Sequence, residues 1–184
     1  VAQRVDDVAR FERRWRALAP AAATPVADQV DYRLLGSAIA RARWELSIEQ
    51  GWRRNPMFYV DQTLGSVYAL LLQPPPFDTT RQADIVARVK RIAPTLKAAE
   101  RNLDDLRQPF AQLAIDELDG IREKTGRVQA SLAPLLAARH RRALDKALPE
   151  ALDALEHFRS GLQARLADAR RDTAIGHDRY DYFL

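Results

Sequence analysis

The sequence predicts an all-α fold, a bundle of about six to eight helices with proline-marked breaks. Apolar residues recur every three or four positions along several long stretches, which places them on one face of an α-helix. No stretch alternates apolar and polar residues for long enough to predict a sheet. Most of the ten prolines lie between the periodic stretches and indicate short connections. We therefore expect a lobe of helices packed around a shared core.

The first two expected helices are separated by proline. A first helix covers residues 1–18, and the Ala-Pro and Thr-Pro pairs that follow end it. Because Thr24 before Pro25 is typical of a helix start, a second helix is expected over residues 25–54. Its apolar arc is wide and contains tryptophans, which predicts packing on two sides. Asn55-Pro56 ends this helix, because the residue before a proline is disfavoured in the helical region.

Two further helices are expected in the middle of the chain. Residues 57–72 form the third, which ends at three consecutive prolines. Asp78 or Thr79 is a suitable N-cap for a long fourth helix, and Pro94 should kink it or split it in two. Its core-facing positions are Ile85, Val89, Ile92, Leu96, Ala99, Leu103 and Leu106.

The last part of the chain predicts three more helical segments. A fifth helix begins at Pro109 and ends near Gly126, and a sixth segment follows over residues 128–142. Pro149 lies near the start of the last long helix, and one interpretation places the first turn there, with residues 141–148 as a separate turn. The core-facing positions of that helix are Leu144, Leu148, Ala151, Leu155, Phe158 and Leu162. Beyond Asp172 the periodic pattern ends.

Length and composition predict a single domain over residues 1–184. The chain is long enough to bury a core, and 47% of its residues are hydrophobic. It begins at Val1, without an initiator methionine, and it ends on aromatic and apolar residues where a polar tail is usual. We therefore expect a segment of a longer protein, cut at both ends.

The charges are informative through their arrangement and not through the net charge of +4. Acidic and basic residues interleave at helical spacing, which is typical of solvated helix faces with local ion pairs. A nucleic-acid-binding protein concentrates basic residues on one face, so we expect no nucleic-acid partner. No apolar run approaches the roughly 20 residues of a membrane-spanning helix. A cytoplasmic location is favoured, and export stays open because the true amino terminus is expected to be missing.

The residue types present predict no catalytic residue and no metal site within this chain. Cysteine is absent, which excludes disulfides and thiolate ligands. The three histidines are not spaced to share a helix face, no HExxH motif occurs, and no glycine-rich phosphate loop is found. No cofactor is therefore expected in this segment. His140 lies among arginines and is expected to face solvent.

Three carboxylates deserve separate consideration. Asp116, Asp119 and Glu123 lie three and four positions apart on the expected fifth helix, so one face could present all three. Such a face could hold a divalent cation or serve in acid–base catalysis. The simpler interpretation, which we favour, is a solvated face that pairs with Arg122 and its neighbours.

The segment 55–62 combines aromatic, amide and acidic side chains around a proline break. Polar groups at such a break can be buried and directed into a groove, because the backbone there is not fully paired. The alternative is an ordinary helix N-terminus, where the helix dipole favours the carboxylate of Asp61. Both interpretations stay open at this point.

Four pieces of the sequence occur together in an order and spacing typical of a known family. The pieces are DYRLL (31–35) with RWEL (43–46), NP and FYVDQ (55–62) with LL and PPPFD (71–78), PFA, AIDEL and GI (109–121), and AIG and YDYFL (174–184). In this arrangement, nearly the whole chain resembles the amino-terminal half of the bacterial domain of unknown function 885 family.

Members of that family are longer and resemble mostly helical zinc metallopeptidases with an HExxH motif beyond the matched region. The resemblance implies that this chain is the helical amino-terminal part of such a protein. It also implies that the zinc ligands and the general base lie outside this segment, so zinc would be a cofactor of the full-length parent. The carboxy-terminal half of the same polypeptide is the expected partner.

Within such a protein, this half would form one wall of a peptide-binding cleft, with the peptide substrate as a second partner. Wall contacts are expected at polar and aromatic residues next to helix breaks, namely Asn55, Tyr59, Asp61, Gln62, His177 and Tyr180. The leading interpretation is a non-catalytic scaffold and cleft wall of a zinc-dependent peptidase. The rival is a stand-alone helical module that binds a protein partner through its apolar grooves.

Overall fold

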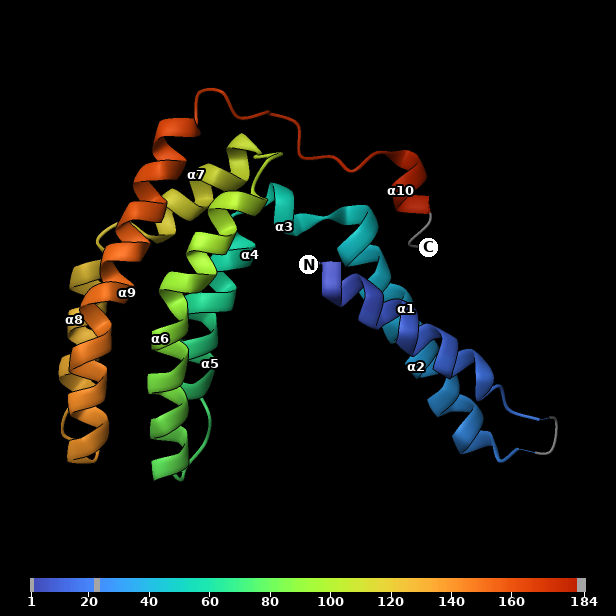
Figure 1. Ribbon diagram of the computed structural model, residues 1–184, viewed down its shortest axis with the longest axis horizontal. Coiled ribbons are helices and arrows are strands. Elements are labelled where there is room, and N and C mark those ends of the chain that lie inside the picture. The colour runs from blue at the N-terminus through green and yellow to red at the C-terminus, as the bar shows by residue number, and fades with distance from the viewer. Residues whose placement is uncertain (1, 22–23, 182–184) are drawn as a thin grey trace. The chain divides into compact units, whose positions relative to one another are not determined.

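The computed structural model describes residues 2–21 and 24–181, and these residues form an all-α structure (Figure 1). The predicted fold class is confirmed. Among the described residues, β-type pairing is confined to an isolated bridge between Arg107 and Arg170. The helices described in the structure include none that is long and apolar enough to cross a membrane.

The chain divides into two compact units, residues 1–51 with 174–184 and residues 52–173. The first unit contains α1 (Ala2–Ala17), α2 (Val26–Trp44), the π-helix η1 (Glu45–Glu49) and α10 (His177–Asp181). The short helix α3 (Gly51–Arg54) begins at the boundary. A single domain over residues 1–184 stays a prediction, because two compact units can belong to one domain.

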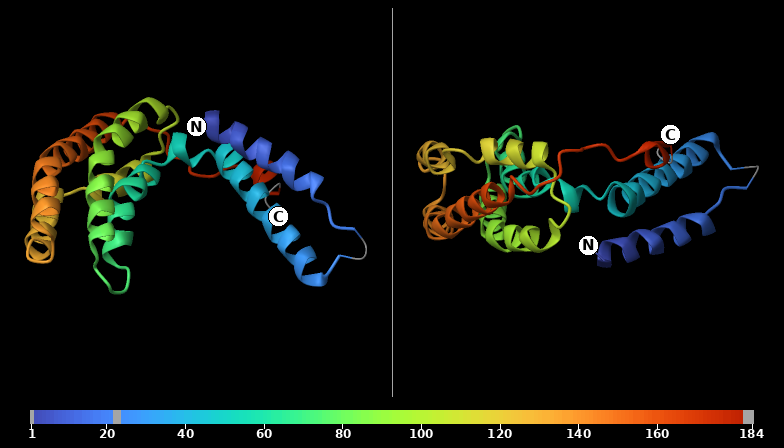
Figure 2. Two further views of the ribbon diagram at one scale, coloured as in Figure 1. Left: turned by 60° about the horizontal axis from the view of Figure 1, so that its bottom comes forward. Right: turned by 90° about the horizontal axis from the view of Figure 1, so that it is seen from above.

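α1 and α2 lie side by side as a helical hairpin (Figures 1 and 2). The ring of Trp15 stacks on Tyr32 with 4.7 Å between centroids, and its indole N–H donates to the Tyr32 carbonyl at 2.8 Å. Gly36 permits this approach, because a Cβ at that position would overlap the Trp15 ring. No described residue of α1 or α2 is buried, so the expected packing of α2 on two sides is not found within this unit.

The expected helix over residues 25–54 is interrupted at Gln50. This residue adopts a left-handed backbone conformation with φ of 52°, and its N–H donates to the Glu45 carbonyl to close the π-helical turn of η1. A left-handed residue cannot continue an α-helix, so α3 is a separate turn. α10 joins the end of this hairpin, where Trp44 Nε1 donates to the Arg179 carbonyl at 3.1 Å.

The second unit contains the larger set of helices. They are α4 (Met57–Val60), the π-helix η2 (Asp61–Gly65), α5 (Ser66–Leu71), α6 (Thr79–Asn102), α7 (Gln108–Glu117), α8 (Ile121–Leu132) and α9 (Ala138–Arg165). α4, η2 and α5 follow one another without a gap, so the expected third helix is present over residues 57–71. Asp78 is the N-cap of α6, and its carboxylate accepts from the Arg81 backbone N–H at 2.8 Å.

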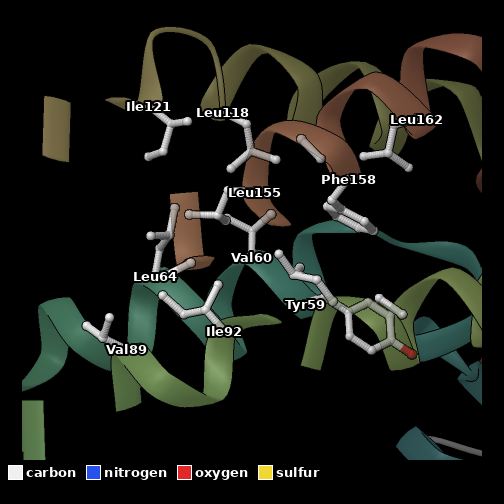
Figure 3. Packing of buried hydrophobic residues seen from close by; sticks show 14 of the residues in the cluster. Tyr59, Val60, Leu64, Val89, Ile92, Leu118, Ile121, Leu155, Phe158 and Leu162 are labelled. Atoms are coloured by element: carbon white, nitrogen blue, oxygen red, sulfur yellow. The ribbon is translucent and has the colours of Figure 1, made fainter. Parts of the chain in front are cut away.

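α6 and α9 form the centre of this unit and pack against one another. All seven positions predicted to face the core from the α6 segment are buried, and so are all six predicted on α9. Helix α4 and the η2 turn add Tyr59, Val60 and Leu64 to the same hydrophobic cluster (Figure 3). The periodic pattern alone therefore located the inner faces of both long helices.

The prolines inside the long helices do not divide them. α6 continues through Pro94 and α9 through Pro149. Both prolines lie at exposed positions, so the backbone carbonyls that lose a hydrogen-bond donor can be hydrated. Of the two outcomes expected at Pro94, a kink or a split, the split is therefore wrong. A separate turn over residues 141–148 is wrong as well, because α9 already begins at Ala138.

The expected fifth and sixth segments are divided differently in the structure. Gly120 has φ of +62° and separates α7 from α8, whereas Gly126 lies inside α8. The true break before the last helix lies between Leu132 and Ala138. Glycine adopts the left-handed region at little cost, and the sequence alone does not show which of two nearby glycines will do so.

Candidate functional site

The candidate segment 55–62 begins as a capped helix start. The side-chain Oδ1 of Asn55 accepts a hydrogen bond from the Met57 backbone N–H at 3.0 Å, and Pro56 is buried beside it. An amide oxygen that caps the first turn satisfies a donor that would otherwise have no partner. Asn55 therefore has a defined structural role, whether or not it also contacts a ligand.

Tyr59 is part of the core of the unit. Its side chain is 4% exposed, its hydroxyl donates to the Trp52 carbonyl at 2.8 Å, and it accepts from Nδ2 of Asn102 at 3.1 Å. Burial raises the pKa of the Tyr59 hydroxyl above its ordinary value, so this group stays protonated. Its hydroxyl joins three segments of the unit, and its role as a substrate contact stays a prediction.

Asp61 and Gln62 lie on the widened turn of η2 and are exposed. Below them, the hydroxyl of the buried Thr63 donates to the Tyr59 carbonyl at 2.7 Å. Short π-helical turns inside α-helices are frequent at functional sites because they change the direction of the side chains on the turn. The turn thus presents a carboxylate and an amide from a base that is fixed in the core.

Two buried arginines, which the sequence analysis did not single out, lie just before this segment and across from it. Arg107 donates to the carboxylates of Asp172 at 2.5 Å and Asp105 at 2.6 Å. Arg54 donates from Nη2 to the Thr173 carbonyl at 3.0 Å. Both guanidinium groups are almost fully buried, so each depends on these hydrogen bonds for its stability.

Backbone hydrogen bonds hold the same region together. The Asp105 and Arg107 N–H groups donate to the carbonyls of Arg53 and Arg54, both at 3.2 Å. On the other side of this segment, Gln108 N donates to the Arg170 carbonyl at 2.7 Å. The stretch between α6 and α7 is therefore paired on both sides. A pair of adjacent arginines before Asn-Pro is the sequence signal that could have indicated this region.

A pocket of about 270 Å³ lies beside this network. Its lining consists of Asp104, Asp105, Leu106, Arg165, Asp168, Ala169 and Arg170. A hydrogen bond from Arg53 holds the pKa of the Asp104 carboxyl below its ordinary value of 3.8. The Asp104 carboxyl is therefore ionised near neutral pH, and it faces the pocket as a charged group paired with Arg53.

His177 and Tyr180 lie on α10, in the unit that contains residues 174–184. Both are exposed, and Nε2 of His177 lies 3.3 Å from Oδ2 of Asp181. Asn55, Tyr59, Asp61 and Gln62 belong to the other unit. The six predicted wall residues are thus divided between the two units, and their role as substrate contacts stays a prediction.

The chain was compared with protein families, with curated proteins and with solved structures. The family model described as "Bacterial protein of unknown function (DUF885)" matches residues 1–184. The chain belongs to the DUF885 family. No curated protein and no solved structure matches the chain.

The described residues of this DUF885 chain do not fit zinc, the metal that the resemblance implies for a full-length parent. They contain no group of three or more histidine, cysteine or acidic side chains placed to hold a metal ion. His140 was expected to face solvent, but it is buried. Its imidazole can be buried because Nδ1 has a polar partner, Oε1 of Gln82, at 3.1 Å. His157 is exposed, 3.6 Å from Glu100. The donors needed for zinc are not gathered in this part of the molecule.

The three carboxylates expected on one face of the DUF885 chain are in fact separated by the break at Gly120. Asp116 accepts from Gln112 on α7, and Glu123 pairs with Arg127 on α8. Asp119 pairs across to Arg159 at 2.6 Å. The expected shared face is wrong because it assumed one continuous helix. The favoured interpretation, surface ion pairs, applies to Asp119 and Glu123, but their partners are Arg159 and Arg127 and not Arg122.

Proposed function

We propose that this chain is the helical, non-catalytic amino-terminal part of a larger DUF885 polypeptide, where it serves as scaffold and as one wall of a peptide-binding cleft. The observation that carries the proposal is an exposed apolar stripe on α2. The stripe would pack on the carboxy-terminal half of the same polypeptide. The zinc ligands and the general base would come from that half.

The stripe consists of Val26, Val30 and Leu34, spaced by four residues and therefore on one face of α2. Their exposed fractions are 75%, 47% and 62%, and no described residue of α2 is buried. An amphipathic helix obtains most of its stability from packing its apolar face. A contiguous exposed apolar face is typical of a surface that another protein segment covers.

The wall of the proposed cleft rests on the η2 turn. Asp61 and Gln62 are exposed on a turn whose inner residues, Thr63 and Leu64, are buried in the core. The fixed backbone of this turn holds both residues in place, so only their side chains have to be ordered when they bond to peptide amides. His177 and Tyr180 are the wall residues proposed for the other unit.

Peptide hydrolysis by the full-length protein tests this proposal. We expect hydrolysis of short peptides that a zinc chelator abolishes, and none by residues 1–184 alone. Gln62→Ala should raise KM about tenfold with little change in kcat, because it removes a hydrogen bond to the substrate backbone. Gln163→Ala, at an exposed position of α9, is the matched control and should change neither constant.

Unchanged KM and kcat in a folded Gln62→Ala variant would show that Gln62 is not part of the wall that contacts the peptide. Hydrolysis that a zinc chelator does not inhibit, or hydrolysis by residues 1–184 alone, would contradict the proposal that the carboxy-terminal half supplies the zinc ligands and the general base. Tyr180→Ala provides a second test of the wall in the other unit. Tyr59→Ala is unsuitable, because this side chain is buried and hydrogen-bonded to Trp52 and Asn102.

A stand-alone helical interaction module is the second candidate, and the same stripe on α2 favours it. The reading frame downstream of Leu184 separates the two candidates. Continuation for hundreds of codons into an HExxH motif supports the scaffold, and a stop codon supports the module. In either case Leu34→Asp should weaken association, because it places a charge in the apolar contact.

A further inference from the structure

A groove lies in the unit of residues 52–173 between the proline-rich loop 72–78 and α8. Its volume is about 490 Å³, which is in the size range of small-molecule sites. The lining consists of Leu71, Gln73, Pro75, Phe77, Arg81, Arg127, Val128, Ser131, Leu132 and Leu135. None of the residues discussed for the peptide wall contributes to it.

The floor of the groove is apolar and borders a deeper cavity. Leu71, Val128 and Leu132 line both spaces. The deeper cavity, of about 50 Å³, is enclosed by apolar side chains of α5, α6, α8 and α9, with Thr125 and Gln129 among the few polar residues. An apolar ligand tail in the groove would therefore cover apolar surface that is otherwise exposed to water, and this burial favours binding.

The charge of the groove is positive. Its lining contains two arginines and no acidic residue. Arg81 is buried, and its guanidinium donates to main-chain carbonyls, including those of Leu70 at 2.6 Å, Gln73 at 2.7 Å and Leu71 at 2.9 Å. The Arg81 guanidinium is thus occupied by main-chain carbonyls, which leaves Arg127 as the cation of the lining that a ligand can contact.

Arg127 lies at the rim and is available to a ligand. Its ion pair with Glu123 has an N–O distance of 3.5 Å, and both side chains are more than 70% exposed. An exposed pair of this kind contributes little free energy, so a ligand carboxylate in the groove can replace Glu123. The hydroxyl of Ser131 already donates to the Arg127 carbonyl. Few other polar groups of the lining can therefore form hydrogen bonds with the amides of a ligand.

We propose that this groove binds an unbranched amphiphilic carboxylate of the fatty-acid class. The carboxylate accepts hydrogen bonds from Arg127 at the rim, and the alkyl chain lies along Leu132 and Val128 toward the deeper cavity. A peptide fits less well, because each of its amide groups requires a partner that the apolar floor lacks. This binding site is separate from the peptide wall and does not depend on peptidase activity.

Isothermal titration of residues 1–184 with dodecanoate, below its micelle concentration, tests the proposal. We expect saturable binding of one molecule per chain. Arg127→Gln should weaken it about tenfold, which corresponds to the loss of one charge-assisted contact. Arg141→Gln, at an exposed position of α9 outside the lining, is the matched control and should bind as the wild type does.

Two further measurements test the groove without the Arg127→Gln variant. On the wild-type chain, dodecanol should bind about tenfold more weakly than dodecanoate, because it lacks the anionic group. Val128→Trp should abolish binding by filling the groove. Equal affinity for the acid and the alcohol, no saturable binding, or tighter binding of an acetylated peptide that ends in leucine would each overturn the proposal.

Discussion

At the scale of single residues, Arg81 shows how one side chain can organise a loop. The C-terminal carbonyls of a helix lack intrahelical donors, and the prolines that follow α5 supply none. Arg81 donates to the carbonyls of Leu70 and Leu71 at the end of α5 and to that of Gln73 in the loop. Its guanidinium also lies 5.2 Å from the centre of the Phe77 ring.

Arg81→Met should therefore destabilise the chain by about 2–4 kcal/mol, because one buried and several partly buried carbonyls lose their donors while the apolar stem is largely kept. Urea denaturation followed by circular dichroism measures this loss. Arg91→Met, at an exposed position of the same helix, is the control and should change the free energy of unfolding by less than about 0.5 kcal/mol. A similar stability for both variants would contradict the organising role of Arg81.

The candidate site was only partly predictable at this scale. Proximity to the proline break correctly indicated that segment 55–62 has an unusual local structure, which includes the Asn55 cap and the η2 turn. The buried contacts of Arg54 with Asp105 and Thr173, and of Arg107 with Asp172, were not predictable, because these partners lie more than 50 residues away in the sequence. Charged residues carry no periodic signal that identifies a distant partner.

At the scale of elements, periodicity predicted the long helices well and their ends poorly. The inner faces of α6 and α9 follow from apolar spacing, which is a property of many residues together. Helix ends depend on single backbone conformations, such as the left-handed Gln50 and Gly120. Exposed prolines such as Pro94 and Pro149 are tolerated inside α6 and α9, although proline usually indicates a break.

Substitutions of Gly120 and Gly126, the two glycines near the α7–α8 connection, should change the stability of the chain in opposite directions. Gly120→Ala should destabilise the chain by about 1 kcal/mol, because alanine is strained at a φ of +62°. A Cβ at either glycine would meet no atom within 4 Å, so this cost is purely conformational. Gly126→Ala should stabilise the chain by roughly 0.5–1 kcal/mol, because it lies inside α8.

Thermal or urea unfolding of the two glycine variants measures both effects in one experiment. Destabilisation by Gly126→Ala would mean that α8 ends before this residue. A neutral Gly120→Ala would mean that the left-handed connection is not formed in solution.

At the scale of the whole molecule, burial is unevenly distributed. The buried hydrophobic residues of the core lie between Tyr59 and Leu162, all in the unit of residues 52–173. The α1–α2 hairpin relies on the Trp15–Tyr32 stack and on half-buried contacts. The fold class and the main core were predictable from the sequence. The division into two units was not, because a wide apolar arc on α2 gives the same sequence pattern whether the rest of the chain covers it or not.

Hydrogen–deuterium exchange should reflect this difference directly. We expect backbone amides of α2 to exchange about two orders of magnitude faster than those of α6 and α9, because local opening of α2 exposes little apolar surface that is not already exposed. Mass spectrometry of peptic fragments resolves the three helices. Equal protection of α2 and α6 would show that the stripe on α2 is covered in solution, for example by self-association.

The hydrogen bond between Arg54 and the Thr173 carbonyl joins a residue near the start of the unit of residues 52–173 to the last residue of that unit. The path of the chain through this unit therefore returns close to its starting point. Because the Arg54 side chain is buried, separating these two ends would remove a hydrogen-bond acceptor from a buried cation, so we expect the two ends of the unit to open together.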